Sequence, residues 1–339
     1  MKTMSMYTFI IMGLLLVFSC NDDSMVTEPE QVYQSEGNIW LPTTMWPDTG
    51  NAIHYVSLQD ISVNSSNEIF VATDFAGVFK TEDEGTNWTI VNDGFIKFDT
   101  DTTYFVSALT SMSNSIYSGN TDLSTIGGIF SLESSAEKWK PSVIWEEYSY
   151  VATLETNSKG EIFAGCKSGL YYSQDAGKNW IDIGQDLNWA SLAYAYTVAF
   201  DSNDKVYIGT RDGMYMSENR GDSWAQLGLA SEAVLSIAIN SKDEIFASLE
   251  NEEIMRSTDG GMTWEEVLKL DGNNIRHLFI NLNDIIFVST WKGIYRSNDN
   301  GANFEHIGLE NTSIEKIVIN SEGHMIAGSY RDGIFISKE

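Results

Sequence analysis

The chain has few cysteines, which excludes a fold held together by a disulfide framework. Its 339 residues contain two, Cys20 and Cys166. Cys20 lies at the end of an N-terminal leader, so a single thiol remains beyond it, and one thiol cannot form an internal bridge. We expect Cys166 to be a small buried residue at the end of a strand.

Basic residues are also scarce, and their scarcity argues against a nucleic-acid partner. The chain has 20 lysines and arginines against 48 aspartates and glutamates, a formal net charge of −28. A surface with this excess of negative charge repels a phosphate backbone, which proteins bind through Lys and Arg. We therefore expect no nucleic-acid binding.

Signals for several kinds of catalytic centre are missing. No glycine-rich phosphate loop leads into a helix, and no stretch beyond the leader has the apolar period of an amphipathic helix. The histidines lack the spacing of zinc ligands. They are His54, His277, His306 and His324. We expect an all-β fold with neither a cofactor nor a metal ion.

A short motif recurs along most of the chain. Its pattern is Ser/Thr-x-Asp-x-Gly-x-x-Trp, and its copies begin at Thr81, Ser173, Ser217, Ser257 and Ser297. The last three copies start 40 residues apart, which is the length of one propeller blade. Short β-branched and aromatic segments, separated by Gly, Asn and Asp turns, fill the intervals, as expected of strands joined by hairpins.

The motif is interpreted as a turn-forming element. Its Asp and its Ser or Thr can accept hydrogen bonds from backbone N–H groups, its Gly supplies a positive φ, and its Trp packs back onto the strands. The acid positions are Asp83, Asp175, Asn219, Asp259 and Asp299, with an amide at Asn219. We predict that these residues stabilise turns and do not bind ligand.

These copies resemble the BNR/Asp-box repeats of sialidases, sortilin-type receptors, xyloglucan hydrolases and photosystem II assembly factors. The resemblance covers nearly all of the chain after its leader and implies a β-propeller. Seven strand–turn–strand units can be counted, which start at Ile61, Ala108, Leu154, Val198, Ile237, Leu278 and Ile317. We therefore predict an all-β fold, a single seven-bladed β-propeller of four-stranded antiparallel blades. Residues 35–40 contain a Gly-x-x-Trp half-motif, so an N-terminal strand is expected to complete the C-terminal blade and close the ring.

The first residues resemble the leader of a bacterial lipoprotein. Lys2 precedes an apolar run over residues 7–18 that is too short to span a bilayer, and Val17-Phe18-Ser19-Cys20 resembles a lipobox. The resemblance implies a signal peptide over residues 1–19 and an acylated Cys20. An ordinary secretory signal is the alternative.

The polar stretch after Cys20 is expected to be a flexible tether. Residues 20–36 have few core-forming side chains, and the propeller is expected over residues 37–339. Asn21-Asp22-Asp23 resembles the surface-export signal of Bacteroidetes lipoproteins. It implies a protein anchored in the outer membrane by its lipid alone and exposed at the cell surface.

A ligand site is expected where the loops between the second and third strands meet the entries to the inner strands, at one mouth of the ring. Each inner strand has a polar residue one step before its core position. These residues are Asp60, Ser107, Thr153, Thr197, Ser236, His277 and Lys316. We expect a polar ring around the channel, and a channel that only holds ordered water is the alternative. The candidate ligand-binding residues are Asp60, Arg211, Arg276, His277, Trp291, Lys292, Lys316, Tyr330 and Arg331.

The sixth and seventh blades combine cations with aromatic residues. Trp291-Lys292 and Tyr330-Arg331 occupy equivalent loops. This combination suits an acidic or uronic sugar, or a carboxylate-bearing peptide, stacked on Trp291 and held by Arg331 and Lys316. Arg211 and His277 are expected to converge on the same place. Packing of Trp291 against a neighbouring blade is the alternative.

The predicted function is non-catalytic binding of a glycan or a protein by a monomeric, lipid-anchored propeller. A sialidase-like glycoside hydrolase is the alternative. That resemblance implies three arginines for a substrate carboxylate, for which Arg211, Arg276 and Arg331 are available, but the Arg-Ile-Pro motif of sialidases is absent. A periplasmic assembly factor or scaffold is the second alternative, and no residue is assigned to catalysis.

Overall fold

Strands are the only regular elements in the described part of the chain. The computed structural model describes residues 33–35, 38–42, 57–95, 104–121, 127–133, 136–145, 150–167, 169–188 and 195–338. All of them belong to one unit, residues 31–339. No helix long and apolar enough to cross a membrane occurs among the described residues. The leader and Cys20 lie outside them.

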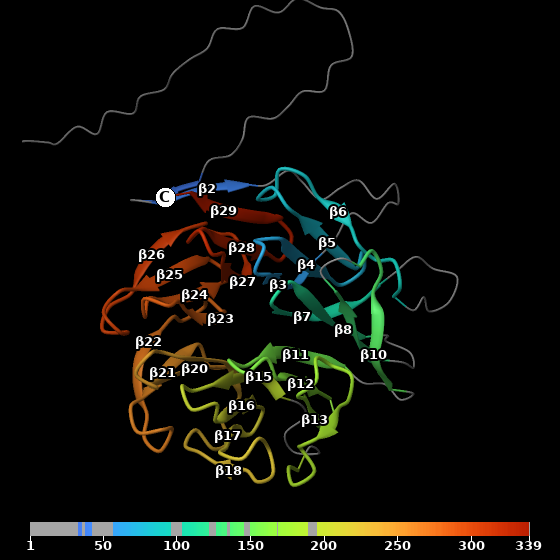
Figure 1. Ribbon diagram of the computed structural model, residues 1–339. Helices are drawn as coiled ribbons and strands as arrows, with labels where there is room; N and C mark the ends of the chain where they lie inside the picture. Colours follow the sequence, from blue (N-terminus) through green and yellow to red (C-terminus); the bar gives the residue numbers. More distant parts are fainter. Residues whose placement is uncertain are drawn as a thin grey trace, which may run out of the picture. The chain divides into compact units, whose positions relative to one another are not determined.

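The strands form seven sheets arranged as the blades of a propeller (Figure 1). The first blade consists of β3 (Leu58–Val63), β4 (Ile69–Thr73), β5 (Val78–Thr81) and β6 (Thr89–Ile90). The second consists of β7 (Val106–Met112), β8 (Ser115–Thr121), β9 (Gly127–Leu132) and β10 (Lys140–Trp145). The third consists of β11 (Val151–Thr156), β12 (Ile162–Cys166), β13 (Gly169–Ser173) and β14 (Ile181–Asp182). Each blade is antiparallel, and its first strand lies at the central channel.

The other four blades repeat this order. The fourth blade consists of β15 (Ala195–Phe200), β16 (Val206–Thr210), β17 (Gly213–Ser217) and β18 (Ala225–Gln226), and the fifth of β19 (Val234–Ile239), β20 (Ile245–Leu249), β21 (Glu253–Ser257) and β22 (Glu265–Lys269). The sixth consists of β23 (Ile275–Ile280), β24 (Ile286–Thr290), β25 (Gly293–Ser297) and β26 (Glu305–Gly308). The seventh consists of β27 (Ile314–Ile319), β28 (Met325–Ser329), β29 (Ile334–Lys338), β2 (Asn38–Pro42) and β1 (Tyr33–Ser35). The predicted seven-bladed propeller is confirmed.

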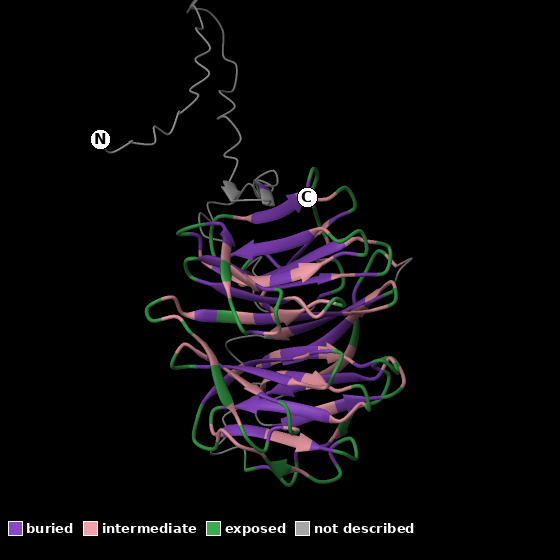
Figure 2. Cartoon of the chain, turned by 90° about the vertical axis from the view of Figure 1, so that its left-hand side faces the viewer, coloured by how far each residue is buried: buried purple, intermediate pink, exposed green. Residues whose placement is uncertain are grey.

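The second strand of each blade is the centre of the core. All five residues of β16 are buried, and the same holds for β4, β12, β20, β24 and β28. A strand covered on both faces by neighbouring blades reads as a continuous apolar or small-residue run. Figure 2 shows the buried strands stacked between exposed loops. Cys166 ends β12 and is fully buried, as predicted.

The recurring motif forms a closed network of hydrogen bonds in its turn. In the fifth blade, the Ser257 hydroxyl accepts the N–H of Gly261 at 2.9 Å and donates to Asp259 at 2.8 Å. Asp259 also accepts the backbone N–H of Thr263 at 2.9 Å and its hydroxyl at 2.6 Å. The Thr263 side-chain and backbone hydrogen bonds, followed by that of Ser257, lower the pKa of Asp259 to about 2. Gly261 has a φ of 90°, as the motif predicts.

The N-terminal strand closes the ring, which confirms the predicted closure. β2 pairs with β29 in antiparallel register, so that Trp40 lies opposite Ser337. The Trp40 side chain is fully buried, and its indole N–H donates to the carbonyl of Ile307 at 3.1 Å. β1 adds a fifth strand outside β2. The outer edge of the seventh blade is thereby covered.

Candidate functional site

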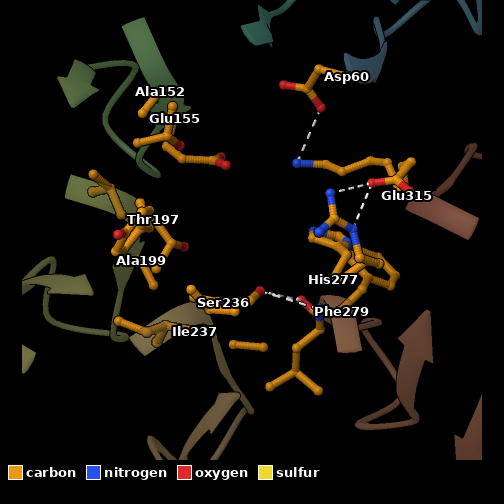
Figure 3. A pocket seen from close by; sticks show the side chains of 18 of the residues that line it. Asp60, Ala152, Glu155, Thr197, Ala199, Ser236, Ile237, His277, Phe279 and Glu315 are labelled. Atoms are coloured by element: carbon orange, nitrogen blue, oxygen red, sulfur yellow. Dashed lines mark hydrogen bonds and ion pairs between the residues drawn. The ribbon is translucent and has the colours of Figure 1, made fainter. Parts of the chain in front are cut away.

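The inner strands surround a cavity of about 390 Å³ in the central channel (Figure 3). Its lining contains every residue of the predicted polar ring, namely Asp60, Ser107, Thr153, Thr197, Ser236, His277 and Lys316. The cavity follows most of β15, β19 and β23, and only the first part of β3, β7 and β27. A polar lining of this size can hold a small hydrophilic group or ordered water.

The inner strands contain bulges, and one of them corrects the alignment of the second blade. The register shifts between Leu58 and Asp60 in β3, and between Val106 and Ala108 in β7. Ala108 is therefore the structural counterpart of Asp60, and Ser107 is the bulge residue. The sequence comparison missed this difference because Ala108 and Leu109 are both apolar, and it took Ala108 in place of Leu109 as the core residue that matches Ile61.

An ion pair joins the last blade to the first inside the cavity. Lys316 Nζ on β27 lies 3.2 Å from Asp60 Oδ1 on β3. Asp60 also accepts the backbone N–H groups of Ile61 at 2.8 Å and Leu109 at 2.9 Å. Burial lowers the pKa of Lys316, but the charges of Asp60 and Glu155 and the hydrogen bond to Asp60 outweigh it, so the pKa is raised. Lys316 is therefore charged at neutral pH and compensates the buried carboxylate.

Glu155 on β11 lines the same cavity and was not selected by the sequence analysis. Figure 3 shows its carboxylate pointing into the cavity. Burial raises the pKa of Glu155 to about 7, although the charge of Lys316 lowers it and that of Asp60 raises it further. A carboxyl that is partly protonated at neutral pH can donate or accept a proton.

A sequence signal for Glu155 was available in the repeat. Glu155 lies two residues beyond Thr153 in β11 and is paired with Phe163 of β12. The equivalent residues of the other inner strands are Ser62, Thr110, Ala199, Ala238, Phe279 and Val318. An acid stands at this position in one blade of the seven.

His277 on β23 presents a neutral imidazole to the cavity. Burial, and then the positive charge of Lys316, lower the pKa of His277 well below its usual range. Its Nδ1 atom is buried and has no hydrogen-bond partner among the described residues. Buried polar atoms are nearly always paired, so this nitrogen is an exception in the wall of the cavity.

Arg276 and Glu315 form a second ion pair beside the first. Arg276 Nη2 and Nε each lie 2.6 Å from Glu315 Oε2, and Glu315 also accepts the hydroxyl of Ser313 at 3.1 Å. Both charged side chains line the cavity. Arg276 is therefore already engaged by a carboxylate of its own chain.

The other candidates lie in the loops after the second strands, outside the cavity lining. Trp291 and Lys292 follow β24, Tyr330 and Arg331 follow β28, and Arg211 follows β16. The backbone N–H of Trp291 donates to Asn273 and that of Tyr330 to Ser313, each at 2.8 Å. Asn273 and Ser313 precede inner strands, so these loops lie at the mouth where the inner strands begin, as predicted.

Three exposed aromatic residues occupy this mouth on consecutive blades. Phe75, Trp291 and Tyr330 have exposed fractions of 37%, 50% and 41%, and they lie in equivalent loops of the first, sixth and seventh blades. We call these three residues the aromatic face. The guanidinium carbon of Arg331 lies 4.8 Å from the ring centroid of Tyr330. Phe75 was not among the candidates, and it lies one residue beyond the position of Trp291 in the repeat, which Asp74 occupies in the first blade.

The residues expected to converge around Trp291 belong to two groups, those of the inner strands and those of the loops. His277 and Lys316 line the cavity, and Lys316 is paired with Asp60. Arg211 lies in the fourth blade, separated from Trp291 by the whole fifth blade. The inner-strand side chains line the cavity, whereas the loop side chains lie outside its lining. The sequence places both groups at the same end of the ring and does not indicate this difference. Of the three arginines considered for a sialidase, Arg276 alone lines the cavity.

Comparisons with known proteins agree with this fold. A family model of the BNR/Asp-box repeat matches residues 255–266, which contain the motif of the fifth blade. No curated protein sequence matches the chain. The extracellular domain of BT4673 from B. thetaiotaomicron is similar in structure, with a TM-score of 0.70 and 14% identity over 92% of this chain. The chain spans 40% of the length of that protein chain.

Two further solved structures have the same architecture over their whole length. YCF48, in a structure with a D1 peptide, has a TM-score of 0.68 and 13% identity, covering 91% of this chain and 99% of its own. Virginiamycin B lyase from Staphylococcus aureus has a TM-score of 0.67 and 13% identity, covering 88% and 98%. Identities this low establish a shared fold and not a shared ligand. The chain is a seven-bladed β-propeller, and the motif of its fifth blade matches the BNR/Asp-box repeat.

Proposed function

We propose that this propeller is a binding module whose ligand lies across the aromatic face. The observation that carries the proposal is the exposure of Phe75, Trp291 and Tyr330 on three consecutive blades. Neighbouring exposed aromatics mark interaction sites on soluble proteins. Three consecutive blades form an extended surface, which suits a polymer, either a glycan or a segment of another protein.

The chemistry beside the aromatic face favours a glycan that carries carboxylates. Aromatic rings stack on the apolar faces of sugars, and Arg is suited to bind carboxylates. Arg331 lies over the ring of Tyr330, and Lys292 adjoins Trp291. Lys316 has no part in this proposal, because Asp60 neutralises it inside the cavity.

A protein segment is the other candidate ligand. The observation in its favour is the similarity to YCF48, a propeller whose structure contains a D1 peptide. A peptide also offers apolar side chains to exposed aromatics and carboxylates to arginine. The same surface would then serve an assembly or scaffolding role.

Catalysis is the second candidate function, and Glu155 is the observation that favours it. A carboxyl with a pKa of about 7, in a cavity that also contains Asp60, has the character of a general acid. The fold carries an enzyme in virginiamycin B lyase. Binding remains the preferred function, because the arginines that a sialidase requires are not gathered in the cavity.

Trp291→Ala is expected to weaken ligand binding by roughly 5- to 150-fold, as loss of an aromatic anchor does. Its melting temperature should stay close to that of the wild type, because half of the side chain is exposed. The measurement is binding to a glycan array and to a peptide library, followed by titration of the strongest ligand. The matched control is Leu282→Ala, which removes a fully exposed side chain at the other end of the same blade.

Identical binding profiles for wild type, Trp291→Ala and the double variant with Arg331→Ala would contradict the site. The array also separates the candidate functions. Glycans recovered intact support binding, whereas cleavage that Glu155→Gln abolishes would support the glycoside hydrolase.

We also propose that the protein is displayed outside the cytoplasm through a lipid on Cys20. The lipobox-like residues 17–20 support this proposal, and the BT4673 neighbour is an extracellular domain. Labelling cells with a fatty acid is expected to mark the wild type, and Cys20→Ala is expected to lose both the label and membrane retention. An unlabelled, soluble wild type would rule out the anchor.

A further inference from the structure

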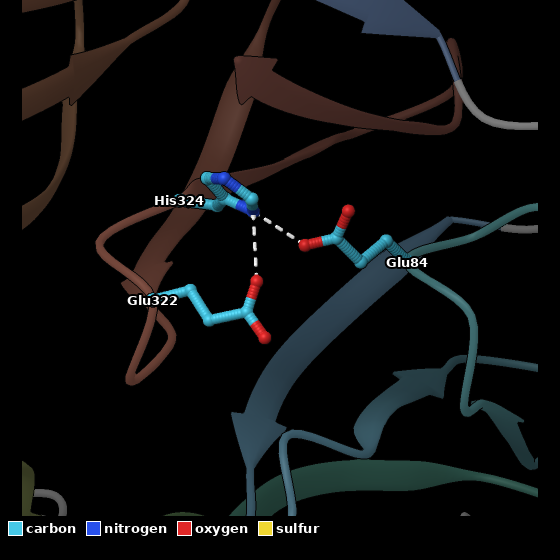
Figure 4. Close-up of side chains that lie close together, drawn as sticks. All are labelled: Glu84, Glu322 and His324. Atoms are coloured by element: carbon cyan, nitrogen blue, oxygen red, sulfur yellow. Dashed lines mark hydrogen bonds and ion pairs between the residues drawn. The ribbon is translucent and has the colours of Figure 1, made fainter. Parts of the chain in front are cut away.

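Two carboxylates and an imidazole meet where the last blade adjoins the first (Figure 4). Glu84 lies in the motif turn between β5 and β6, whereas Glu322 and His324 lie in the turn between β27 and β28. Each offers one ligand atom, and all three atoms lie within 4.8 Å of one another. His324 Nδ1 contacts Glu84 Oε1 and lies 3.9 Å from Glu322 Oε2.

The turn that carries Glu322 and His324 is held in place by backbone hydrogen bonds. Asn320 Oδ1 accepts the N–H of Glu322 at 3.1 Å and that of His324 at 2.9 Å. The next residue of the turn, Ser321, donates its N–H to Asn67 of the first blade at 3.0 Å. The three side chains therefore project from a joint between two blades whose backbone is already positioned, which favours binding of an ion between them.

At two corresponding joints elsewhere in the ring, an acid is paired with a donor from the motif turn. Between the third and fourth blades, Arg220 from the motif turn pairs with Glu161 at 3.1 Å. Between the fifth and sixth blades, the Asn300 amide donates to Glu244 at 2.6 Å. In both places the motif residue supplies a donor to an acid on the adjoining turn.

The joint between the seventh and first blades exchanges these roles, because the motif turn supplies the acid and the adjoining turn supplies an imidazole, with a hydrogen bond between His324 Nδ1 and Glu84 Oε1. Glu84 replaces the donor and His324 replaces the acid, while Glu322 adds a second carboxylate. Neither carboxylate forms an ion pair with Lys or Arg in the described part of the chain. Two carboxylates beside one imidazole attract a cation strongly, because their negative charges repel each other at this separation.

We propose that Glu84, Glu322 and His324 bind a divalent transition metal ion, with Zn²⁺ as the best fit. Zn²⁺ takes one imidazole nitrogen and carboxylate oxygens as ligands and accepts water in a remaining position. Imidazole disfavours Ca²⁺ and Mg²⁺, which prefer oxygen ligands alone. The ion would link the seventh blade to the first and so add to the closure made by β2 and β29. The histidine pattern in the sequence predicted no metal, because His324 and Glu84 are 240 residues apart.

The test is a titration of chelator-treated, folded protein with zinc chloride, followed by calorimetry and by thermal melting. We expect one Zn²⁺ per chain and a melting temperature that rises with zinc concentration. Glu322→Gln and His324→Gln should each lower the affinity by at least about tenfold, since loss of a partner that only orients a ligand already costs this much. Glu322 is 60% exposed, so its variant tests the site without disturbing the fold.

The control is His306→Gln, which removes another surface histidine with a nearby acid, Glu310 at 4.0 Å. This variant should bind zinc as the wild type does. Three results would overturn the proposal. The first is no zinc binding by the wild type at roughly hundredfold excess. The second is wild-type zinc affinity in both Glu322→Gln and His324→Gln. The third is binding of Ca²⁺ as tight as that of Zn²⁺, which would indicate a general attraction of cations to an acidic surface.

Discussion

Trp40→Ala is expected to lower the free energy of unfolding by about 3–5 kcal/mol. The indole is fully buried with Ile317 and Phe335 in the core of the seventh blade. Its removal leaves a cavity and deprives the Ile307 carbonyl of its donor. It also removes a fully buried apolar anchor of β2, the strand that closes the ring. Urea unfolding followed by circular dichroism measures the change.

The exposed Trp291 provides the comparison for Trp40. Trp291→Ala should change the free energy of unfolding by no more than about 0.5 kcal/mol, as expected for a surface position. Equal midpoints for both variants would mean that β2 does not hold the ring closed. A loss of unfolding free energy in Trp40→Ala but not in Trp291→Ala would show that closure of the ring by β2, rather than the number of tryptophans, determines stability.

Lys316→Met is expected to destabilise the protein by about 3 kcal/mol, because it leaves the Asp60 carboxylate buried and unpaired. The side chains of Lys316 and Asp60 are 23% and 10% exposed, so water can compensate little of this charge. The double variant Asp60→Asn/Lys316→Met should be more stable than Lys316→Met alone. Strictly additive losses would contradict the pairing.

The same substitution is expected to raise the pKa of Glu155 further above its value of about 7. Lys316 is the one charge that lowers this pKa, and Met cannot replace it. The titration of the carboxyl can be followed by nuclear magnetic resonance, with Glu155→Gln identifying the signal. An unchanged pKa in Lys316→Met would mean that the two groups do not interact across the cavity.

Glu155 also makes stability depend on pH in a defined direction. Its pKa is about 7 in the folded protein against 4.5 for an ordinary glutamate, so the folded state binds the proton more tightly. The contribution of Glu155 to the free energy of unfolding therefore falls as the pH rises from about 4.5 to 7. Glu155→Gln should lack this decline over the same range.

The sequence by itself determined the class of fold, the number of blades and the way in which the ring closes. These features depend on signals within one repeat, such as Ser257, Asp259 and Gly261 in a single turn, or Trp40 at a half-motif. Local hydrogen-bonding chemistry decides such turns, and the 40-residue spacing then requires blades. The polar ring could be predicted for the same reason, apart from the second blade, where the counterpart of Asp60 is Ala108 and Ser107 lies one position before it.

Only the tertiary structure decided which charged and aromatic groups meet. Ring closure brings the first and last blades together, and so it creates the Asp60–Lys316 pair, the cluster around His324 and the aromatic face. The repeat pattern places each residue within its own blade but carries no information on the orientation of its side chain toward the next. Desolvation adds a second cause, since the raised pKa of Glu155 depends on a cavity that seven strands enclose together.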